Sequence, residues 1–183
     1  TAIVELAVEK ILEENVLVVG AGIKTGLSIR IDNPAQLGSD LVVDSVAAIV
    51  EYPAPLLIFD LGTANTVCVI DKNKNYIGGM IYPGIGVSLD SLTAHASQLG
   101  GISIEAPEHM IGKNTTECMK SGLIYSSAAA MDGIIDRLQE QLGGEATVIA
   151  TGGLAKKIVP HCRREIILDD DLLLKGLAII YKK

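Results

Sequence analysis

The segment DLGTANT at positions 60–66 carries the side chains best suited to hold a phosphate. It follows a short apolar run, so Asp60 is expected at the end of a strand. Gly62 lets backbone N–H groups approach an anion closely, and the hydroxyls of Thr63 and Thr66 add hydrogen-bond donors. A carboxylate at the strand end can hold a cation or its water beside that anion. Taken alone, the same pattern also fits a glycine hairpin turn with satisfied polar side chains.

Two further glycine clusters follow in the order that a nucleotide site needs. Gly78-Gly79 and Pro83-Gly84 bracket a short apolar segment, and Gly152-Gly153 lie between a predicted buried strand and a helix. A glycine pair at such a junction lets a flat group lie on the backbone, as an adenosine does. Each cluster alone is an ordinary turn. The order of phosphate loop and then adenosine site matches the layout of actin-like ATPases.

The elements that must position these residues show both helical and extended patterns. Asp40 is predicted to cap one helix, and Pro53 to stop it. Two strands joined by the polar residues 71–75 predict an antiparallel hairpin. The sequence as a whole predicts an α/β protein with a mixed sheet. Further helices are predicted at 1–14, 87–99, 116–142 and 171–181, and strands at 16–19, 56–59, 67–70, 76–82 and 148–150.

Composition excludes several classes of function. The chain has 183 residues, of which 49% are hydrophobic, so it can bury a substantial core. Its net charge of −7 and six aromatic residues (five Tyr, one Phe) offer no basic or stacking surface for nucleic acid or an anionic membrane. No apolar run reaches the roughly 18 to 20 residues that span a bilayer. The three cysteines have no metal-ligand spacing to the three histidines, so we expect reduced thiols in a cytoplasmic protein.

On these motifs the chain resembles type III pantothenate kinases, which are actin-like ATPases, over nearly its whole length. Several segments are generic alone, but their ordered set is specific. The resemblance implies an actin-like (ribonuclease H-like) ATPase fold: residues 1–53 would be the C-terminal part of a truncated first half, and residues 54–183 a complete second half with a mixed sheet and flanking helices. The matching segments lie at 18–26, 32–34, 38–40, 60–64, 78–84, 111–115, 121–122, 150–153 and 171–177.

The resemblance implies ATP-dependent phosphorylation of the primary hydroxyl of pantothenate to 4'-phosphopantothenate, the first step of coenzyme A biosynthesis. Asp40 matches the family's catalytic base, and Asp60 the residue that binds a monovalent cation, potassium or ammonium; magnesium would accompany ATP. Thr115 matches a threonine that contacts pantothenate across a homodimer interface, although an Asn-Thr pair before a helix is otherwise explained by capping. The other implied site residues are Gly38 for pantothenate, and Gly62, Thr63, Ala64, Thr66, Gly152 and Gly153 for ATP.

Three features depart from the family pattern. The family opens with a strand–turn–strand that carries a first phosphate loop, and no such motif precedes Thr1, so we expect a fragment or a subunit whose first half comes from elsewhere. Leu41 stands where the family has an arginine, and Ile31 where it often has a tyrosine. Both family side chains hold pantothenate, so their loss weakens the case for ordinary pantothenate binding.

Two alternatives therefore stay open. One is an actin-like kinase with a different small-molecule acceptor, which Ile31 and Leu41 favour. The other is a catalytically silent paralogue or accessory subunit that acts through binding, because phosphoryl transfer depends on clamping both phosphates and metal. A dinucleotide oxidoreductase is rejected, since Gly20-x-Gly22 is followed by Gly26 rather than by a glycine at the required spacing.

Overall fold

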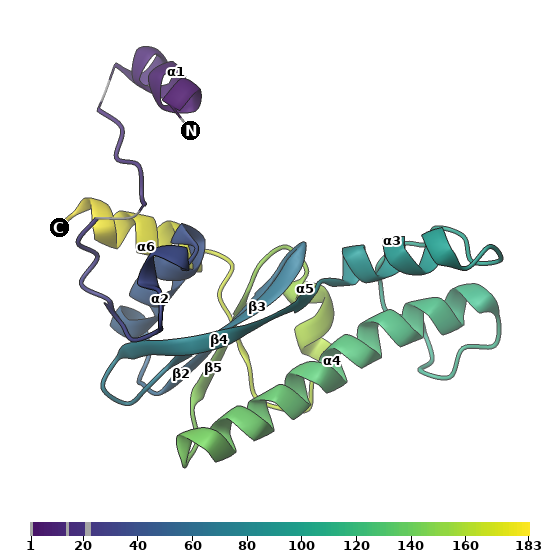
Figure 1. The fold of residues 1–183 in the computed structure, drawn as a ribbon. Helices are drawn as coiled ribbons and strands as arrows, with labels where there is room; N and C mark the ends of the chain where they lie inside the picture. The colour runs from purple at the N-terminus through teal and green to yellow at the C-terminus, as the bar shows by residue number, and fades with distance from the viewer. Residues whose placement is uncertain (1, 14, 21–22) are drawn as a thin grey trace.

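The computed structural model describes residues 2–13, 15–20 and 23–183. A mixed six-stranded sheet carries helices on both of its faces (Figure 1). In chain order the elements are α1 (Ala2–Leu12), β1 (Ser28–Ile29), the 3₁₀ helix η1 (Pro34–Gln36), α2 (Ser39–Glu51), β2 (Leu56–Leu61), β3 (Ala64–Ile70), β4 (Asn75–Pro83), α3 (Ile85–His95), α4 (Thr115–Leu142), β5 (Thr147–Thr151), α5 (Ala155–Ile158), the 3₁₀ helix η2 (Val159–His161), β6 (Ile167–Leu168) and α6 (Leu172–Tyr181).

The sheet has the order β1-β4-β3-β2-β5-β6. The pairs β2–β3 and β3–β4 are antiparallel, whereas β1–β4, β2–β5 and β5–β6 are parallel, so the predicted mixed sheet is confirmed. The predicted hairpin between β3 and β4 is also present. Its turn is closed by Asp71, whose Oδ1 accepts hydrogen bonds from the backbone N–H groups of Asn73 at 2.8 Å and Asn75 at 2.9 Å.

The central strand β2 is covered on both faces, as its continuous apolar run predicts. Leu57 and Phe59 belong to the core formed with α4, whereas Leu56 and Ile58 belong to the core formed with α2 and α6. Because side chains alternate along a strand, Asp60 follows Ile58 onto the face covered by α2 and α6. The alternation therefore determines which helices the phosphate-site aspartate meets.

Helices α2 and α6 approach each other closely on that face (Figure 1). A Cβ atom on Gly176 of α6 would lie only 2.2 Å from the carbonyl oxygen of Val43 in α2. The glycine thus permits a backbone contact that any side chain would push apart. This contact fixes the position of α2 over the sheet.

Some local predictions differ from the structure. Residues 16–19 form no regular strand, since none of the described strands pairs with them. The N-cap of α2 is Gly38 rather than Asp40, which lies in the first helical turn and accepts a hydrogen bond from Leu41 N at 2.9 Å. The strands β1 and β6 were not predicted, because two residues carry no readable alternation.

The segment before Pro53 contacts the rest of the chain at several places. Strand β1 pairs with β4, and α2 packs against α6 and β2. The proposed division into 1–53 and 54–183 stays a prediction. Among the helices in the described residues, none is both long and apolar enough to cross a membrane.

Candidate active site

Three carboxylates gather where α2 covers the end of β2. Asp40 and Asp44 are four residues apart on α2, so they project from one face of the helix, one turn from each other. Asp60 lies near the carboxyl end of β2 on the face that α2 covers. The charge of Asp40 lies close enough to raise the pKa of both Asp44 and Asp60, and the charge of Asp60 also raises the pKa of Asp44. The structure therefore brings the predicted base and the predicted cation ligand into one cluster.

The surroundings of Asp44 and Asp60 disfavour the ionised form of both carboxyl groups. Burial, followed by the charges of Asp60, Asp40 and Asp169, raises the pKa of Asp44 from 3.8 to about 7. Burial, followed by the charge of Asp40, also raises the pKa of Asp60. The nearby Lys175 does not neutralise the cluster, because its Nζ pairs with Asp169 at 2.7 Å and with Glu51 at 2.9 Å. The site consequently favours a proton or a bound cation among its carboxylates.

Two hydroxyl side chains flank Asp60 on the neighbouring strands. Thr66 of β3 and Thr151 of β5 both stand directly opposite Asp60 in the sheet register, and so lie on the same face. The Oγ1 atom of Thr66 is buried and has no hydrogen-bond partner among the residues that the structure describes. A buried polar atom without a partner is costly, so this oxygen is suited to receive a ligand.

The two glycine segments predicted to bind ATP lie side by side beyond the strand ends. The N–H of Leu154 donates a 3.2 Å hydrogen bond to the carbonyl of Leu61, which links the turn after β5 to the turn after β2. Gly152 has a φ of +92°, and a Cβ there would lie 2.4 Å from Asp60 Oδ1. Only glycine fits this position without strain. Gly62 is half-buried, while the tips Thr63, Ala64 and Gly153 are exposed.

A cavity of about 470 Å³ lies between the N-terminus of α2 and strand β4. Gly38 and Leu41, which flank Asp40 in the sequence, both line it, and so does Ile31. A Cβ on Gly38 would lie 2.5 Å from Asp40 Oδ1. The two departures from the family pattern therefore face one cavity, with the predicted base at its edge.

Thr115 lies apart from this cluster. It is the exposed first residue of α4, whose first turns extend with α3 beyond the end of the sheet (Figure 1). Asn114 caps this helix by accepting a 2.9 Å hydrogen bond from Glu117 N, and Glu117 Oε2 accepts one from Lys113 N at 2.9 Å. Reciprocal capping therefore accounts for this segment locally. A role of Thr115 toward pantothenate would require a second chain.

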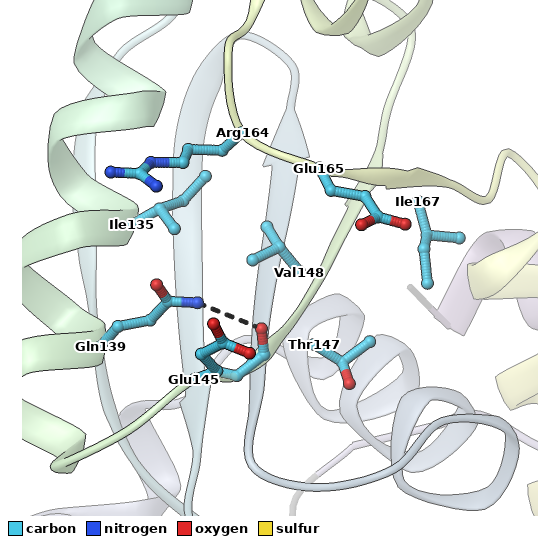
Figure 2. A pocket seen from close by; sticks show the side chains of 9 residues that line it. Ile135, Gln139, Glu145, Thr147, Val148, Arg164, Glu165 and Ile167 are labelled. Carbon is cyan, nitrogen blue, oxygen red and sulfur yellow. Dashed lines mark hydrogen bonds between the residues drawn. The ribbon is translucent and has the colours of Figure 1, made fainter.

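Another cavity, of about 350 Å³, lies at the opposite end of the strands. Figure 2 shows Arg164, Glu145 and Glu165 around it, with Gln139 Nε2 donating to the carbonyl of Ala146 at 3.3 Å. Its floor includes Thr147, which begins β5, whereas the carboxylate cluster lies where β5 ends. None of the predicted site residues lines this cavity.

The sequence analysis missed Asp44. Its side chain is only 3% exposed, and within the described ranges its Oδ1 has no hydrogen-bond partner. The sequence does carry a signal for Asp44: it is an acidic residue one helical turn after Asp40, on the apolar face that continues to Ala47 and Ala48. Helical spacing alone, however, does not say that this face meets another carboxylate.

Two oxygen-bearing side chains near the carboxylate cluster are of the kind that bind hard cations. Asp60 and the unpartnered Thr66 Oγ1 present oxygen ligands on adjacent strands. Across the described ranges, no group of three or more His, Cys, Asp or Glu side chains is arranged to hold a metal ion. Magnesium would therefore need phosphate and water ligands in addition to protein oxygens.

Known proteins similar to this chain identify its family. The model of the family described as type III pantothenate kinase matches residues 1–137. The type III pantothenate kinases of Exiguobacterium sp. and Exiguobacterium sibiricum are 46% and 48% identical, and each alignment covers 91% of this chain. That of Bacillus cytotoxicus is 45% identical over 96% of the chain and 67% of its own length. The chain spans 65% of the length of the two Exiguobacterium relatives.

Solved structures of low identity share the fold. A protein described as a Baf family transcriptional activator from Campylobacter jejuni has a TM-score of 0.56 at 19% identity, covering 96% of this chain and 87% of its own. The ethanolamine utilization protein EutJ from Carboxydothermus hydrogenoformans has a TM-score of 0.51 at 14% identity, covering 96% and 70%. The α/β fold is thus of the actin-like class, as predicted. The match of the family model and the identity of the curated relatives show that the chain belongs to the type III pantothenate kinase family.

Proposed function

We propose that this chain provides the catalytic and phosphate-binding residues of a kinase that transfers the γ-phosphoryl group of ATP to the primary hydroxyl of pantothenate. Family membership supports the proposal, because the curated relatives carry that activity in their names. The observation that carries it is that α2 brings Asp40 to the face of the sheet where Asp60 lies beside the glycine turn at Gly152. Phosphoryl transfer needs such a convergence of a base, a phosphate cradle and a cation.

Asp40 is proposed to accept the proton of the acceptor hydroxyl. Its side chain is exposed at the start of α2, so a substrate could reach it without displacing core residues. The partial positive charge of a helix N-terminus also lies here and favours the developing charge of a transferring phosphoryl group. Gly38 beside it would allow the acceptor to approach closely.

The phosphate side is proposed to lie across the strand ends. The backbone of Gly62 to Ala64 and the hydroxyls of Thr63 and Thr66 would hold phosphate oxygens, while Gly152 and Gly153 would carry the adenosine. Asp60 with Thr66 would hold potassium or ammonium, whose charge offsets the repulsion between carboxylates and phosphates. Magnesium would bind between the phosphate oxygens and water and neutralise their charge.

We further infer a homodimer that acts in the cytoplasm on pantothenate and ATP, with neither nucleic acid nor membrane as a partner. The exposed position of Thr115 at the free start of α4 is compatible with a contact to a second chain. Sedimentation that shows only monomer would contradict this role of Thr115.

The test is transfer of labelled phosphate from ATP to pantothenate in potassium buffer, comparing the unaltered chain with Asp40→Asn. Loss of a general base typically lowers the rate by about 10²- to 10⁴-fold. Asp90→Asn is the matched control, because Asp90 is an exposed aspartate on α3. Unchanged circular dichroism would show that Asp40→Asn leaves the fold intact. An Asp40→Asn protein as active as the Asp90→Asn control would refute the assigned base. Absence of transfer while ATP and pantothenate both bind would instead favour the binding-only alternative.

A further inference from the structure

One border of the sheet is the short strand β6 with its flanking residues 165–171, the β6 edge. Strand β6 stands last in the sheet order, so among the described strands none pairs with its outer side. It pairs with Ile149 and Ala150 of β5, whereas β2 pairs with β5 over all of Thr147–Thr151. The first residues of β5 thus have a strand on one side only. A border of this kind offers main-chain N–H and C=O groups to another extended chain.

The centre of the β6 edge is apolar and open. Ile167 and Leu168, the two residues of β6, are 37% and 39% exposed. Neighbouring residues of a strand point to opposite faces of the sheet, so each face presents one of these side chains. A strand added beside β6 would cover both with its own apolar side chains.

Acidic residues flank this apolar centre at both ends. Glu165 precedes β6, Asp170 and Asp171 follow it, and all three are exposed. Asp170 Oδ2 pairs with Lys156 Nζ at 2.6 Å. No ion pair in the described part of the chain includes Glu165 or Asp171. Each end of the β6 edge therefore carries a negative charge that no basic side chain neutralises.

The cavity of about 350 Å³ adjoins the Glu165 end of the β6 edge (Figure 2). Glu145 and Glu165 both line it, and neither takes part in an ion pair within the described ranges. Arg164 lines it too, but its Nη2 pairs with Asp136 Oδ1 at 2.7 Å. The neighbouring Arg163 lines a different cavity. Apolar side chains of α4 and β5 form part of the wall, so the cavity suits the aliphatic stem and cationic head of a basic side chain.

We propose that the β6 edge binds an extended segment of another protein that is apolar in its centre and carries a basic side chain at each end. The backbone of the segment would pair with β6. One basic side chain would enter the cavity beside Glu145 and Glu165, and the other would lie beside Asp171. This surface is separate from the proposed kinase site, since none of the predicted site residues lines the cavity.

The charges of the β6 edge favour this occupant over two others. A second copy of the same edge, in either direction, would set acidic ends against acidic ends, and like charges on paired strands repel. A free amine would meet the carboxylates but would leave the main chain of β6 and its two apolar side chains uncovered. A basic, extended segment satisfies all three features of the edge.

The experiment is fluorescence anisotropy of a labelled peptide, Lys-Val-Thr-Val-Lys with blocked ends, added to the full chain. The peptide Glu-Val-Thr-Val-Glu should bind at least about tenfold more weakly, because its charges repel those of the edge. The basic peptide with N-methyl groups on alternate residues keeps its charges but loses main-chain donors. It should also bind at least about tenfold more weakly.

A charge reversal on the protein tests the same contact from the other side. Glu165→Lys should weaken binding of the basic peptide by at least about tenfold and strengthen binding of the acidic one. Asp90→Lys is the matched control, because it makes the same change in net charge at an exposed residue of α3, beyond the end of the sheet (Figure 1). That control should keep the preference for the basic peptide. Circular dichroism would show that both variants are folded.

Several results would overturn the proposal. Absence of binding, equal binding of the basic and acidic peptides, or equal binding of the methylated and unmethylated peptides would each do so. A folded Glu165→Lys protein that binds the basic peptide as tightly as the Asp90→Lys control would contradict the assigned contact. Displacement of the peptide by an equal concentration of 1,5-diaminopentane would assign the cavity to a free amine instead. Sedimentation in which Glu165→Lys changes the oligomeric state would assign the edge to a second copy.

Discussion

Replacing Asp44 by asparagine tests whether the carboxylate cluster controls the stability of this fold. The side chain of Asp44 is 3% exposed. The charges of Asp60, Asp40 and Asp169 lie near enough to raise its pKa. The thiol of Cys68 also lies near it, and burial raises the pKa of that thiol to about 12, so it stays neutral. Asparagine keeps the size of the side chain and removes its charge.

The magnitude follows from the raised pKa of Asp44. Its value shifts from 3.8 to about 7 on folding, and each pKa unit corresponds to about 1.4 kcal/mol. The folded state thus binds this proton more tightly than the unfolded state does. The free energy of unfolding should therefore fall as the pH rises from about 4 to about 7, by up to about 4 kcal/mol, and this contribution should be flat above that range.

The assay is urea unfolding, followed by circular dichroism, between pH 5 and pH 8. Asp44→Asn should remove the decrease in the free energy of unfolding with rising pH. The variant should therefore gain stability relative to the unaltered protein as the pH rises. Asp60, whose pKa is also raised, contributes a slope of the same sign, which remains in the variant and cancels in the difference. Lys175 and Tyr52 lower the pKa of Asp169, so its effect on stability falls at more acidic pH than this assay covers. Exposed Asp90→Asn should leave the slope unchanged. Parallel pH profiles for Asp44→Asn and the unaltered protein would refute the buried, proton-binding role of Asp44.

Two glycine substitutions test the close approaches of the backbone, and urea unfolding measures both. Gly152→Ala should destabilise the fold by at least about 2 kcal/mol, because the residue combines a φ of +92° with contacts below 3 Å. Neighbouring Gly153→Ala, whose Cβ meets nothing within 4 Å, should change stability by less than about 0.5 kcal/mol. Gly176→Ala should lower the free energy of unfolding by about 1 to 3 kcal/mol, because its methyl group would push against Val43. Gly122→Ala on α4, where a Cβ meets nothing within 4 Å, should raise the free energy of unfolding by up to about 1 kcal/mol. Equal effects within either pair would contradict the packing described.

Much of the fold could be predicted from local patterns. The uninterrupted apolar run of β2 indicated a strand covered on both faces, and the polar turn at 71–75 indicated the β3–β4 hairpin. The caps were less predictable. Gly38, not Asp40, caps α2, because the capping position depends on backbone angles that residue type only biases.

Short strands such as β1 and β6 could not be predicted, since their existence depends on a partner supplied by the folded sheet. The same holds for the absent strand at 16–19. Its apolar residues satisfy the pattern of a strand, but a strand also needs a neighbour to bond its backbone.

The sequence by itself determined which residues could perform phosphate chemistry and in what order they follow along the chain. The turn at 60–66 and the pair Gly152-Gly153 were predicted from residue type and spacing, and Asp40 was predicted from the resemblance to the family. Only the tertiary structure decided that α2 places Asp40 and Asp44 near Asp60, and that Ile31 and Leu41 share one cavity. The physical reason is that periodicity specifies the buried face of an element but not the element that covers it. Long-range packing determines which element covers a face. Here Gly176 allows α6 to pack closely against α2.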